Sequence, residues 1–266
     1  MIYDLQKASL MKRFSAFLLD LVLVVIVFTG ALFAVSSILD YDSYFTALET
    51  RVNEIQESHS IKEVEQNSLI YFDEYQYMTE EEKLNLPLEV QEVYAACTEE
   101  IRTDKEYLKL SETIMSLSIL MLSISMLAAF ILLEFIVPLI LKNGQTVGKK
   151  IFSIAVMRND AVKISPVVLF IRAILGKYTI GTMLPIIMLL MLLAGAAPII
   201  PIAIILLVLL LQLVLLITTR TRSLIHDYLS STVVVDLQSQ MIFESAEAKQ
   251  EYQLRLHKEA AEKANY

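Results

Sequence analysis

The stretch between Lys177 and Arg220, YTIGTMLPIIMLLMLLAGAAPIIPIAIILLVLLLQLVLLITT (178–219), decides the fold, because its 42 residues include no charged side chain. A single helix of this length would measure about 63 Å, roughly twice the hydrocarbon core of a bilayer. The run must therefore fold back on itself. Gly195-Ala-Ala-Pro198 supplies the turn, since glycine and proline interrupt the apolar residues there. Two membrane spans result, and we expect an integral membrane protein.

Two further apolar stretches are long enough to cross a bilayer. One runs from Phe14 to about Ile38 with Asp20 as its only charge, and the other from about Thr113 to Leu141 with Glu134 as its only charge. The composition agrees, because 56% of the residues are hydrophobic against roughly 45–50% in a soluble domain. The first stretch exceeds the roughly 7–15 apolar residues of a signal peptide, so we favour a retained span over a cleaved leader.

Lys and Arg are distributed unevenly along the chain. Three of the 22 lie in residues 1–13, seven between Lys142 and Lys177 and six from Arg220 onward, whereas residues 40–112 hold six against nineteen Asp and Glu. By the positive-inside bias, the N-terminus, the 142–178 connection and the C-terminal tail lie in the cytoplasm, and the acidic segment faces outward. Four spans satisfy this arrangement.

The expected fold class is an all-α membrane protein with four transmembrane helices. A helical extracytoplasmic insert separates the first two, and a short interfacial helix from Ser165-Pro166 to Tyr178 precedes the third. The chain divides into an N-terminal lead with the first transmembrane helix (1–39), an acidic extracytoplasmic helical insert (40–112), a membrane domain with three transmembrane helices (113–237) and a cytoplasmic helical tail (238–266).

The insert has the pattern of helices rather than of a disordered linker. Apolar residues recur at helical spacing at Tyr44, Leu48, Val52 and Ile55. Thr79-x-x-Glu82 has the form of a capping box, and the sequence from Leu88 to Leu108 predicts one helix that continues into the second span.

Two features of the insert leave alternatives open. We favour packing or interface anchoring over ligand binding for an aromatic cluster made of Tyr71, Phe72, Tyr75 and Tyr77. The single cysteine, Cys97, can close no disulfide within the chain. We expect it to be buried in a helix, with a reactive thiol as the alternative.

A glycine-containing loop, Lys142-Asn-Gly-Gln-Thr-Val-Gly-Lys-Lys150, follows the second span and ends like a phosphate-binding loop. The match fails, because Gly144 and Gly148 are separated by three residues instead of four and Lys150 stands where Ser or Thr is needed. The segment from Ile151 to Met157 then predicts a short strand or extended segment.

Three strongly polar residues are expected at one depth in the membrane. Asp20, Glu134 and Gln212 each lie seven or eight residues from a cation at the cytoplasmic boundary, which is roughly 10–12 Å along a helix. A charge inside a spanning helix costs on the order of 2.5–3.5 kcal/mol by insertion scales, so the two acids need partners.

A polar layer is therefore expected on the cytoplasmic side, with Arg13 bridging Asp20 above it and Asp227 below. The same boundary region contains Arg172 and His226. Two interpretations stay open for this layer. It is either an assembly lock that fixes helix register, or a proton or cation site formed by Asp20 and Glu134.

These residues resemble the RDD family of bacterial membrane proteins, which is named for an arginine at the start of the first span, an aspartate within it and a second aspartate. In this sequence those positions fall on Arg13, Asp20 and Asp227. The resemblance covers about 1–39 and 113–237. Further similarity lies in Glu134, Gly144-Gln-Thr-Val-Gly-Lys149, Val156, Arg172 and Arg222-Ser-Leu-Ile-His-Asp227-Tyr-Leu-Ser-Ser-Thr-Val-Val234. The candidate cluster is thus Arg13, Asp20, Glu134, Arg172, Gln212, His226 and Asp227, with the loop motif Gly144, Thr146, Gly148 and Lys149.

The resemblance implies a bacterial cytoplasmic (inner) membrane and transport of ligands not yet identified, and some members are described as sodium/proton antiporters. Two departures stand out. The family usually joins the first two spans by a short loop, whereas this chain has an insert of about seventy residues. Ala161 also follows Asp160 where the family usually has glycine.

The expected function is transport of a small solute or cation, with proton coupling as one form of it. The alternative is a non-catalytic membrane adaptor or assembly protein whose insert binds a partner. Four helices seldom enclose a path, so transport implies a homo-oligomer or a membrane partner. We expect no enzyme, because His59, His226 and His257 are scattered and no metal-ligand spacing occurs. We also expect no cofactor, no bound metal and no nucleic-acid partner.

Overall fold

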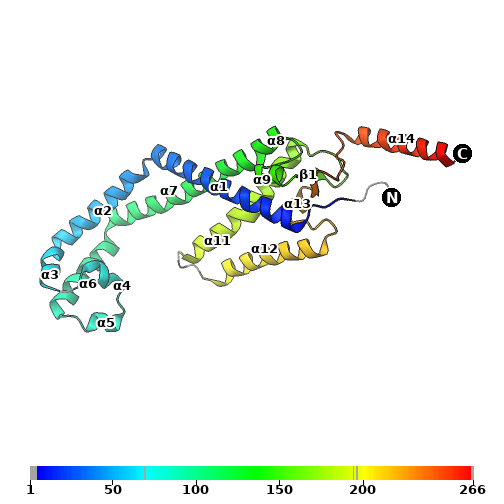
Figure 1. Ribbon diagram of the computed structural model, residues 1–266. Helices are drawn as coiled ribbons and strands as arrows, with labels where there is room; N and C mark the ends of the chain where they lie inside the picture. The colour runs from blue at the N-terminus through cyan, green and yellow to red at the C-terminus, as the bar shows by residue number, and fades with distance from the viewer. Residues whose placement is uncertain (1–4, 69, 194, 196, 265–266) are drawn as a thin grey trace. The chain divides into compact units, whose positions relative to one another are not determined.

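The computed structural model describes residues 5–68, 70–193, 195 and 197–264, and these form two compact units. Unit 1 comprises Met1–Ala31 and Ser123–Tyr266, and unit 2 comprises Leu32–Leu122. Figure 1 labels the elements of both units. Unit 1 contains most of the membrane-spanning residues and the candidate cluster, and unit 2 contains the predicted insert.

Four helices among the described residues are long and apolar enough to cross a membrane. The first is α1 (Leu10–Ile38) and the fourth is α12 (Ile199–Thr218). The second span, Lys105–Leu141, joins α7 (Lys105–Phe130), the π-helical η1 (Ile131–Ile136) and α8 (Val137–Leu141). The third, Pro166–Leu193, joins α10 (Pro166–Phe170), the π-helical η2 (Ile171–Met183) and α11 (Leu184–Leu193). The prediction of four spans is confirmed.

Gly195 lies in the predicted turn between the third and fourth spans. Its φ of 80° is in the left-handed region that glycine adopts without strain. Ala194 and Ala196 of the same turn lie outside the described residues.

The third span begins earlier than predicted. The side chain of Ser165 accepts a hydrogen bond from the backbone of Val168 at 3.3 Å, and Pro166 is in the first turn, as expected for a helix start. The helix then continues to Leu193, because nothing between Tyr178 and Leu184 ends it. A separate interfacial helix is therefore not confirmed.

The expectation of an all-α protein is incomplete, because unit 1 contains a two-stranded antiparallel sheet. Strand β1 (Ile154–Arg158) pairs with β2 (Thr232–Asp236), and Val156 lies opposite Val234. Both faces of this sheet are buried. One face packs Ile154, Val156 and Val234 into one apolar cluster, and the other packs Ala155, Met157, Val233 and Val235 into a second. Apolar side chains on both faces explain why these short β-branched runs form strands.

The sheet gathers distant parts of the chain at one end of the spans. The N-terminal segment adds to β2 through a bridge between Lys7 and Val235, and the backbone N–H of Ala8 donates to Val234. Two short helices flank the strands, namely α9 (Val147–Ile151) and α13 (Ile225–Leu229). After β2, α14 (Ala246–Ala264) forms the tail, and Lys249 Nζ donates to the carbonyl of Asp160 at 2.6 Å.

Unit 2 is helical and has a core of its own. Its elements are α2 (Tyr41–Ser58), α3 (Ile61–Asn67), α4 (Phe72–Tyr77), α5 (Glu80–Leu84) and α6 (Leu88–Thr103). The core is made of Ile55, Ile61, Phe72, Tyr75, Val90, Tyr94 and Cys97. Cys97 is fully buried, as expected, and the capping box of Thr79 and Glu82 is present. The aromatic cluster divides, because Phe72 and Tyr75 pack against Tyr94 while Tyr71 and Tyr77 are exposed.

The prediction of one helix from Leu88 into the second span is wrong, because α6 ends at Thr103 and α7 begins at Lys105. Asp104 causes the break. Its carboxylate accepts a hydrogen bond from the backbone of Tyr107 at 2.7 Å and two from Arg51, at 3.1 and 2.7 Å. These bonds hold the pKa of Asp104 at about 2. A residue that starts a new helix in this way cannot also continue the preceding one.

Candidate functional site

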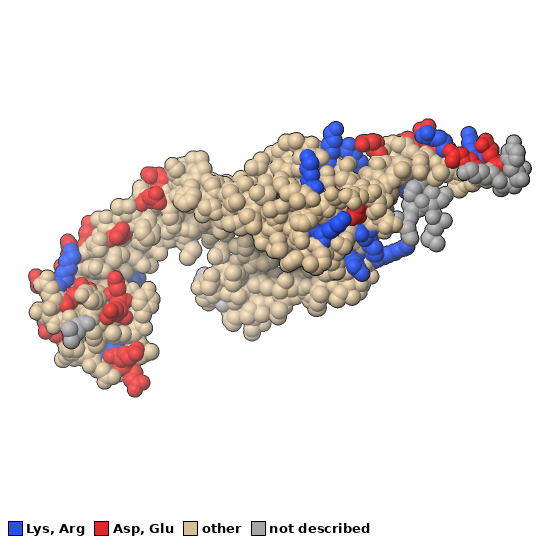
Figure 2. All heavy atoms as spheres, in the orientation of Figure 1, with Lys and Arg blue, Asp and Glu red and all other residues tan. Residues whose placement is uncertain are grey.

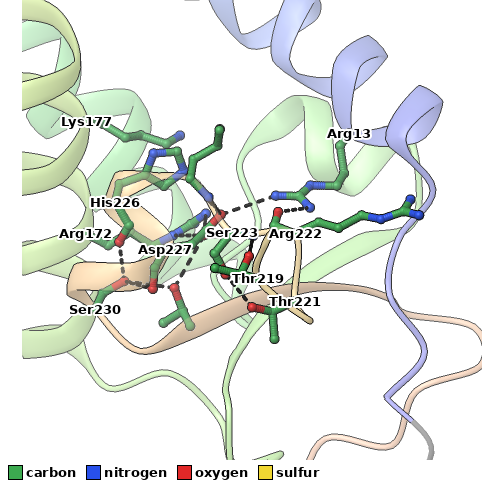
Figure 3. Close-up of polar contacts among 12 residues, drawn as sticks. Arg13, Arg172, Lys177, Thr219, Thr221, Arg222, Ser223, His226, Asp227 and Ser230 are labelled. Atoms are coloured by element: carbon green, nitrogen blue, oxygen red, sulfur yellow. Dashed lines mark hydrogen bonds and ion pairs between the residues drawn. The ribbon is translucent and has the colours of Figure 1, made fainter. Parts of the chain in front are cut away.

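Asp227 lies in the first turn of α13, where two arginines from different spans contact it. Arg172 on η2 donates from Nε and from one terminal nitrogen to Oδ1, at 3.1 and 2.5 Å. Arg13 on α1 donates to Oδ2 at 3.3 Å. Figure 3 shows both guanidinium groups directed at this carboxylate. Although burial acts in the opposite direction, Arg172 and Arg13 lower the pKa of Asp227, so the carboxylate is ionised. The predicted contact of Arg13 with Asp227 is present.

Arg13 also fastens the turn that follows α12. A terminal nitrogen of Arg13 donates to the carbonyl of Arg222 at 2.8 Å, and the hydroxyls of Thr221 and Ser223 lie 2.6 Å apart in the same turn (Figure 3). The backbone N–H of Ser223 donates to Thr219 Oγ1 at 2.8 Å. Arg13 therefore joins the start of the first span to the end of the fourth.

Asp20 does not bind Arg13, and this part of the predicted bridge is wrong. Seven residues of helix separate the two by about 10 Å along the axis, and the guanidinium of Arg13 points to Asp227. Asp20 instead accepts a hydrogen bond from the backbone of Gly148 at 2.8 Å and one from Thr146 Oγ1 at 2.5 Å. In the described part of the chain, no cationic side chain lies within ion-pair distance of Asp20.

The loop motif positions these two donors. Gly144 has a φ of 59°, and a Cβ there would lie 2.9 Å from Val156 Cβ, so the turn needs glycine. Thr146 caps α9 by accepting from the backbone of Lys149 at 3.3 Å. Gly148 packs so closely on α1 that a Cβ would lie 2.9 Å from Asp20 Oδ1 and closer still to the carbonyl of Ala16. The small residues thus bring α9 against the first span.

Glu134 lies on η1 and pairs with Lys177 on η2, with Oε2 and Nζ 2.5 Å apart. The sequence places Lys177 with Arg172 on the polar side of the helix before the third span, but it did not predict the contact with Glu134. The π-helical turn explains the pairing. In an α-helix, residues five apart lie about 140° apart around the axis. In the wider π-helical turn of η2, residues five apart lie nearly one above the other, and the hydroxyl of Thr182 donates to the carbonyl of Lys177 five residues earlier. The wider turn brings Arg172 and Lys177 toward one side, where the cluster lies.

Lys149 is a buried cation between the two carboxylates of the spans. Lys149 is 7% exposed, and its Nζ donates a hydrogen bond to Thr146 Oγ1 at 3.1 Å. Burial, together with the charges of Lys177 and Arg172, lowers the pKa of Lys149 to about 7, although Glu134 and Asp20 act in the opposite direction. The sequence identified Lys149 as a residue of the loop motif, but it did not predict that Lys149 lies in the charged cluster.

His226 and Gln212 occupy the edges of this arrangement. His226 Nε2 is 3.6 Å from Asp227 Oδ2, and burial lowers the pKa of His226 to about 3, so the ring is neutral. Gln212 is half-buried on α12, and its side chain makes no hydrogen bond within the described residues. The structure therefore brings Asp20, Glu134 and Asp227 into one charged cluster but leaves Gln212 out of it. The described residues contain no group of three His, Cys, Asp or Glu that could hold a metal ion.

These features define a multi-pass helical membrane protein with a buried charged cluster at one end of its spans. The sequence matches the RDD family over residues 7–231, and the chain belongs to this family. No curated protein and no solved structure matched the chain.

Proposed function

We propose that the chain moves a small solute or cation across the bacterial cytoplasmic membrane in exchange for a proton, and that Asp20 is the carboxylate whose charge changes. The unpaired state of Asp20 carries this proposal. It is buried in a span, yet it is held by a hydroxyl and a backbone N–H rather than by a cation. A carboxylate inside a membrane span is a functional candidate by default, because an intramembrane charge is costly to keep without a use.

The other two acids have a different role in this proposal. Asp227 is held by Arg13 and Arg172, and Glu134 by Lys177. Breaking a buried ion pair is costly, so these contacts keep the spans in register while Asp20 changes charge. The assembly-lock and ion-site interpretations then apply to different residues of one cluster.

Vesicles with the purified chain and an internal pH-sensitive dye test this function. Imposing a sodium or potassium gradient should move protons in vesicles with the native chain, and Asp20→Asn should reduce the rate at least tenfold. Asp236→Asn is the matched control, because Asp236 on β2 pairs with Lys12 in the first turn of α1 and both side chains are partly exposed. Equal rates in the native and Asp20→Asn vesicles would remove Asp20 from the proposal. The path requires a homo-oligomer or a membrane partner, and the molar mass of the purified chain in detergent distinguishes the two.

A second candidate function is that of a membrane adaptor whose insert binds a partner. Unit 2 favours it, because Tyr71, Tyr77, Leu84 and Leu88 are 61%, 90%, 74% and 69% exposed on a unit that has its own core. Figure 2 shows acidic side chains gathered on this unit, and residues 40–112 hold nineteen acids. Such a surface suits a basic partner on the outer side of the membrane.

The two functions differ in their response to deletion. If the chain is an adaptor, removing residues 45–108 should abolish its cellular phenotype and its cross-linking to one defined partner, while Asp20→Asn leaves both intact. If it is a transporter, the deletion should leave proton movement in vesicles within about twofold of the native rate, because the cluster lies wholly in unit 1.

A further inference from the structure

A continuous hydrogen-bonded path joins Lys149 to Asp20. Lys149 Nζ is 3.1 Å from Thr146 Oγ1, and that oxygen is 2.5 Å from Asp20 Oδ2. An ammonium group only donates and an ionised carboxylate only accepts, so the hydroxyl must accept from Lys149 and donate to Asp20. This is the orientation that a proton relay through a hydroxyl requires. All three residues are buried.

The charges around this path do not balance. The cluster contains three acids, Asp20, Glu134 and Asp227, against four lysine and arginine side chains, Arg13, Lys149, Arg172 and Lys177, while His226 is neutral. Arginine keeps its proton in proteins, and Lys177 is held by Glu134. Among the described residues, Lys149 has no carboxylate within ion-pair distance, so it is the base that can release a proton with the smallest loss of pairing.

The groups that face Lys149 come from each element packed around it. They are Asp20 on α1, Glu134 on η1, and Arg172 and Lys177 on η2. The two cations oppose its charge and the two acids support it, and burial adds to the effect of the cations. Burial and the two cations outweigh the two acids and lower the pKa of Lys149 to about 7.

We propose that Lys149 is a proton-binding site of the membrane unit and that it exchanges its proton with Asp20 through the hydroxyl of Thr146. In this step the N–H bond of the ammonium breaks as Thr146 Oγ takes up that proton, and the hydroxyl passes its own proton to the carboxylate. A neutral amine and a neutral carboxylic acid result, and no oxidant or reductant is involved. The inference rests on the proposed function, because release of the proton from Asp20 completes the exchange.

Nuclear magnetic resonance on the full chain tests the site without any flux. The chain is labelled with ¹³C-lysine in nanodiscs of phosphatidylcholine and phosphatidylglycerol. One Cε resonance should titrate with a midpoint near pH 7. This resonance should be lost in Lys149→Arg and kept in Lys150→Arg, which changes the exposed neighbour on the same helix. Absence of a lysine titration between pH 6 and 8 would overturn the proposal.

Flux variants test the relay. Thr146→Ser keeps the hydroxyl and should retain the native rate of sodium-dependent proton movement within about twofold, whereas Thr146→Val should lose at least tenfold. Lys149→Arg keeps the positive charge and should also lose at least tenfold, because guanidinium does not release its proton. A merely structural cation would be replaced by arginine with little loss, and that outcome would refute the inference.

The two proposals fail differently. If native vesicles move no protons but the Lys149 resonance still titrates near pH 7, the proposed function fails and the proton site stands. If Asp20→Asn abolishes movement but Lys149→Arg and Thr146→Val do not change it, the proposed function stands and the relay is wrong.

Discussion

Asp20 and Asp227 are both buried aspartates, but their partners differ in charge. Asp227 contacts two guanidinium groups, and Asp20 contacts a hydroxyl and a backbone N–H. A change that removes the carboxylate charge should therefore destabilise the protein at Asp227 and alter its activity at Asp20. This difference follows from electrostatics, since an unpaired buried arginine is far more costly than an unpaired backbone amide.

Asp227→Asn should lower the free energy of unfolding by on the order of 3 kcal/mol, because it leaves Arg13 and Arg172 buried without their counter-charge. Asp236→Asn should cost less than about 1 kcal/mol, as expected of a partly exposed ion pair. Denaturant unfolding in detergent, followed by circular dichroism, measures both. Equal losses for the two variants would contradict the structural role of Asp227.

The neutral state of His226 predicts a pH dependence of stability. The unfolded chain protonates this histidine near pH 6.5, whereas burial holds its pKa in the folded chain at about 3. The unfolded state therefore binds more protons in this interval, so stability is complete above pH 6.5 and falls as the pH decreases. The slope contributed by His226 approaches about 1.4 kcal/mol per pH unit.

Unfolding measured at several values between pH 5 and 7 tests this dependence. His226→Gln should reduce the slope, whereas His257→Gln on the exposed face of α14 should leave it unchanged. The explanation is wrong if His226→Gln retains the full slope.

At the scale of the element, the site depends on how closely α9 approaches α1. Gly148→Ala should destabilise the protein by about 1–3 kcal/mol, because the added methyl group meets the backbone carbonyl of Ala16, which cannot move without shifting α1, and also the carboxylate of Asp20. Gly30→Ala is the matched control on α1, since a Cβ there has nothing within 4 Å. Thermal unfolding compares the two, and similar melting temperatures for both variants would contradict the close contact.

The sequence predicts the helices and strands better than the contacts within the cluster. Apolar runs with few charges predict the spans, and the segment from Ile151 to Met157 predicts the first strand, whereas the second strand, Thr232–Asp236, was not predicted. No comparable sequence pattern predicts the π-helical turns, because the spacing of apolar side chains does not reveal whether a backbone N–H donates to the carbonyl four or five residues earlier. The pairing of Glu134 with Lys177 depends on those turns, and so the sequence did not predict it.

The break at Asp104 has the same kind of cause. Nothing in the sequence from Leu88 to Leu108 interrupts a helix, and the interruption depends on Arg51, which is distant in sequence and contacts Asp104 in the folded unit. Local sequence patterns thus predicted the helices, whereas a tertiary contact determines where α6 ends and α7 begins.

At the scale of the whole molecule, the sheet shows which segments lie at the same end of the spans in unit 1. The N-terminal segment pairs with β2, and β2 pairs with β1 from the connection between the second and third spans. The N-terminus, this connection and the tail therefore lie at the same end of the spans in unit 1. The positive-inside bias predicts that this end is the cytoplasmic one.

Cysteine labelling in intact cells tests this orientation. Burial raises the pKa of Cys97 to about 11, so the native thiol should react slowly. A membrane-impermeant maleimide should label Tyr77→Cys before lysis, because Tyr77 is exposed on the insert, and Lys258→Cys only after lysis. The reverse order would place the insert in the cytoplasm and overturn the topology.

In the proposed function, Asp227 is the fixed part of the cluster and Asp20 is the part that changes charge. The most direct test measures proton movement and thermal unfolding on the same vesicle preparations of Asp20→Asn and Asp227→Asn. Asp20→Asn should keep a near-native melting temperature but lose proton movement, whereas Asp227→Asn should melt at a lower temperature. If Asp20→Asn moves protons at the native rate, or destabilises the chain as much as Asp227→Asn does, the division of the cluster is contradicted.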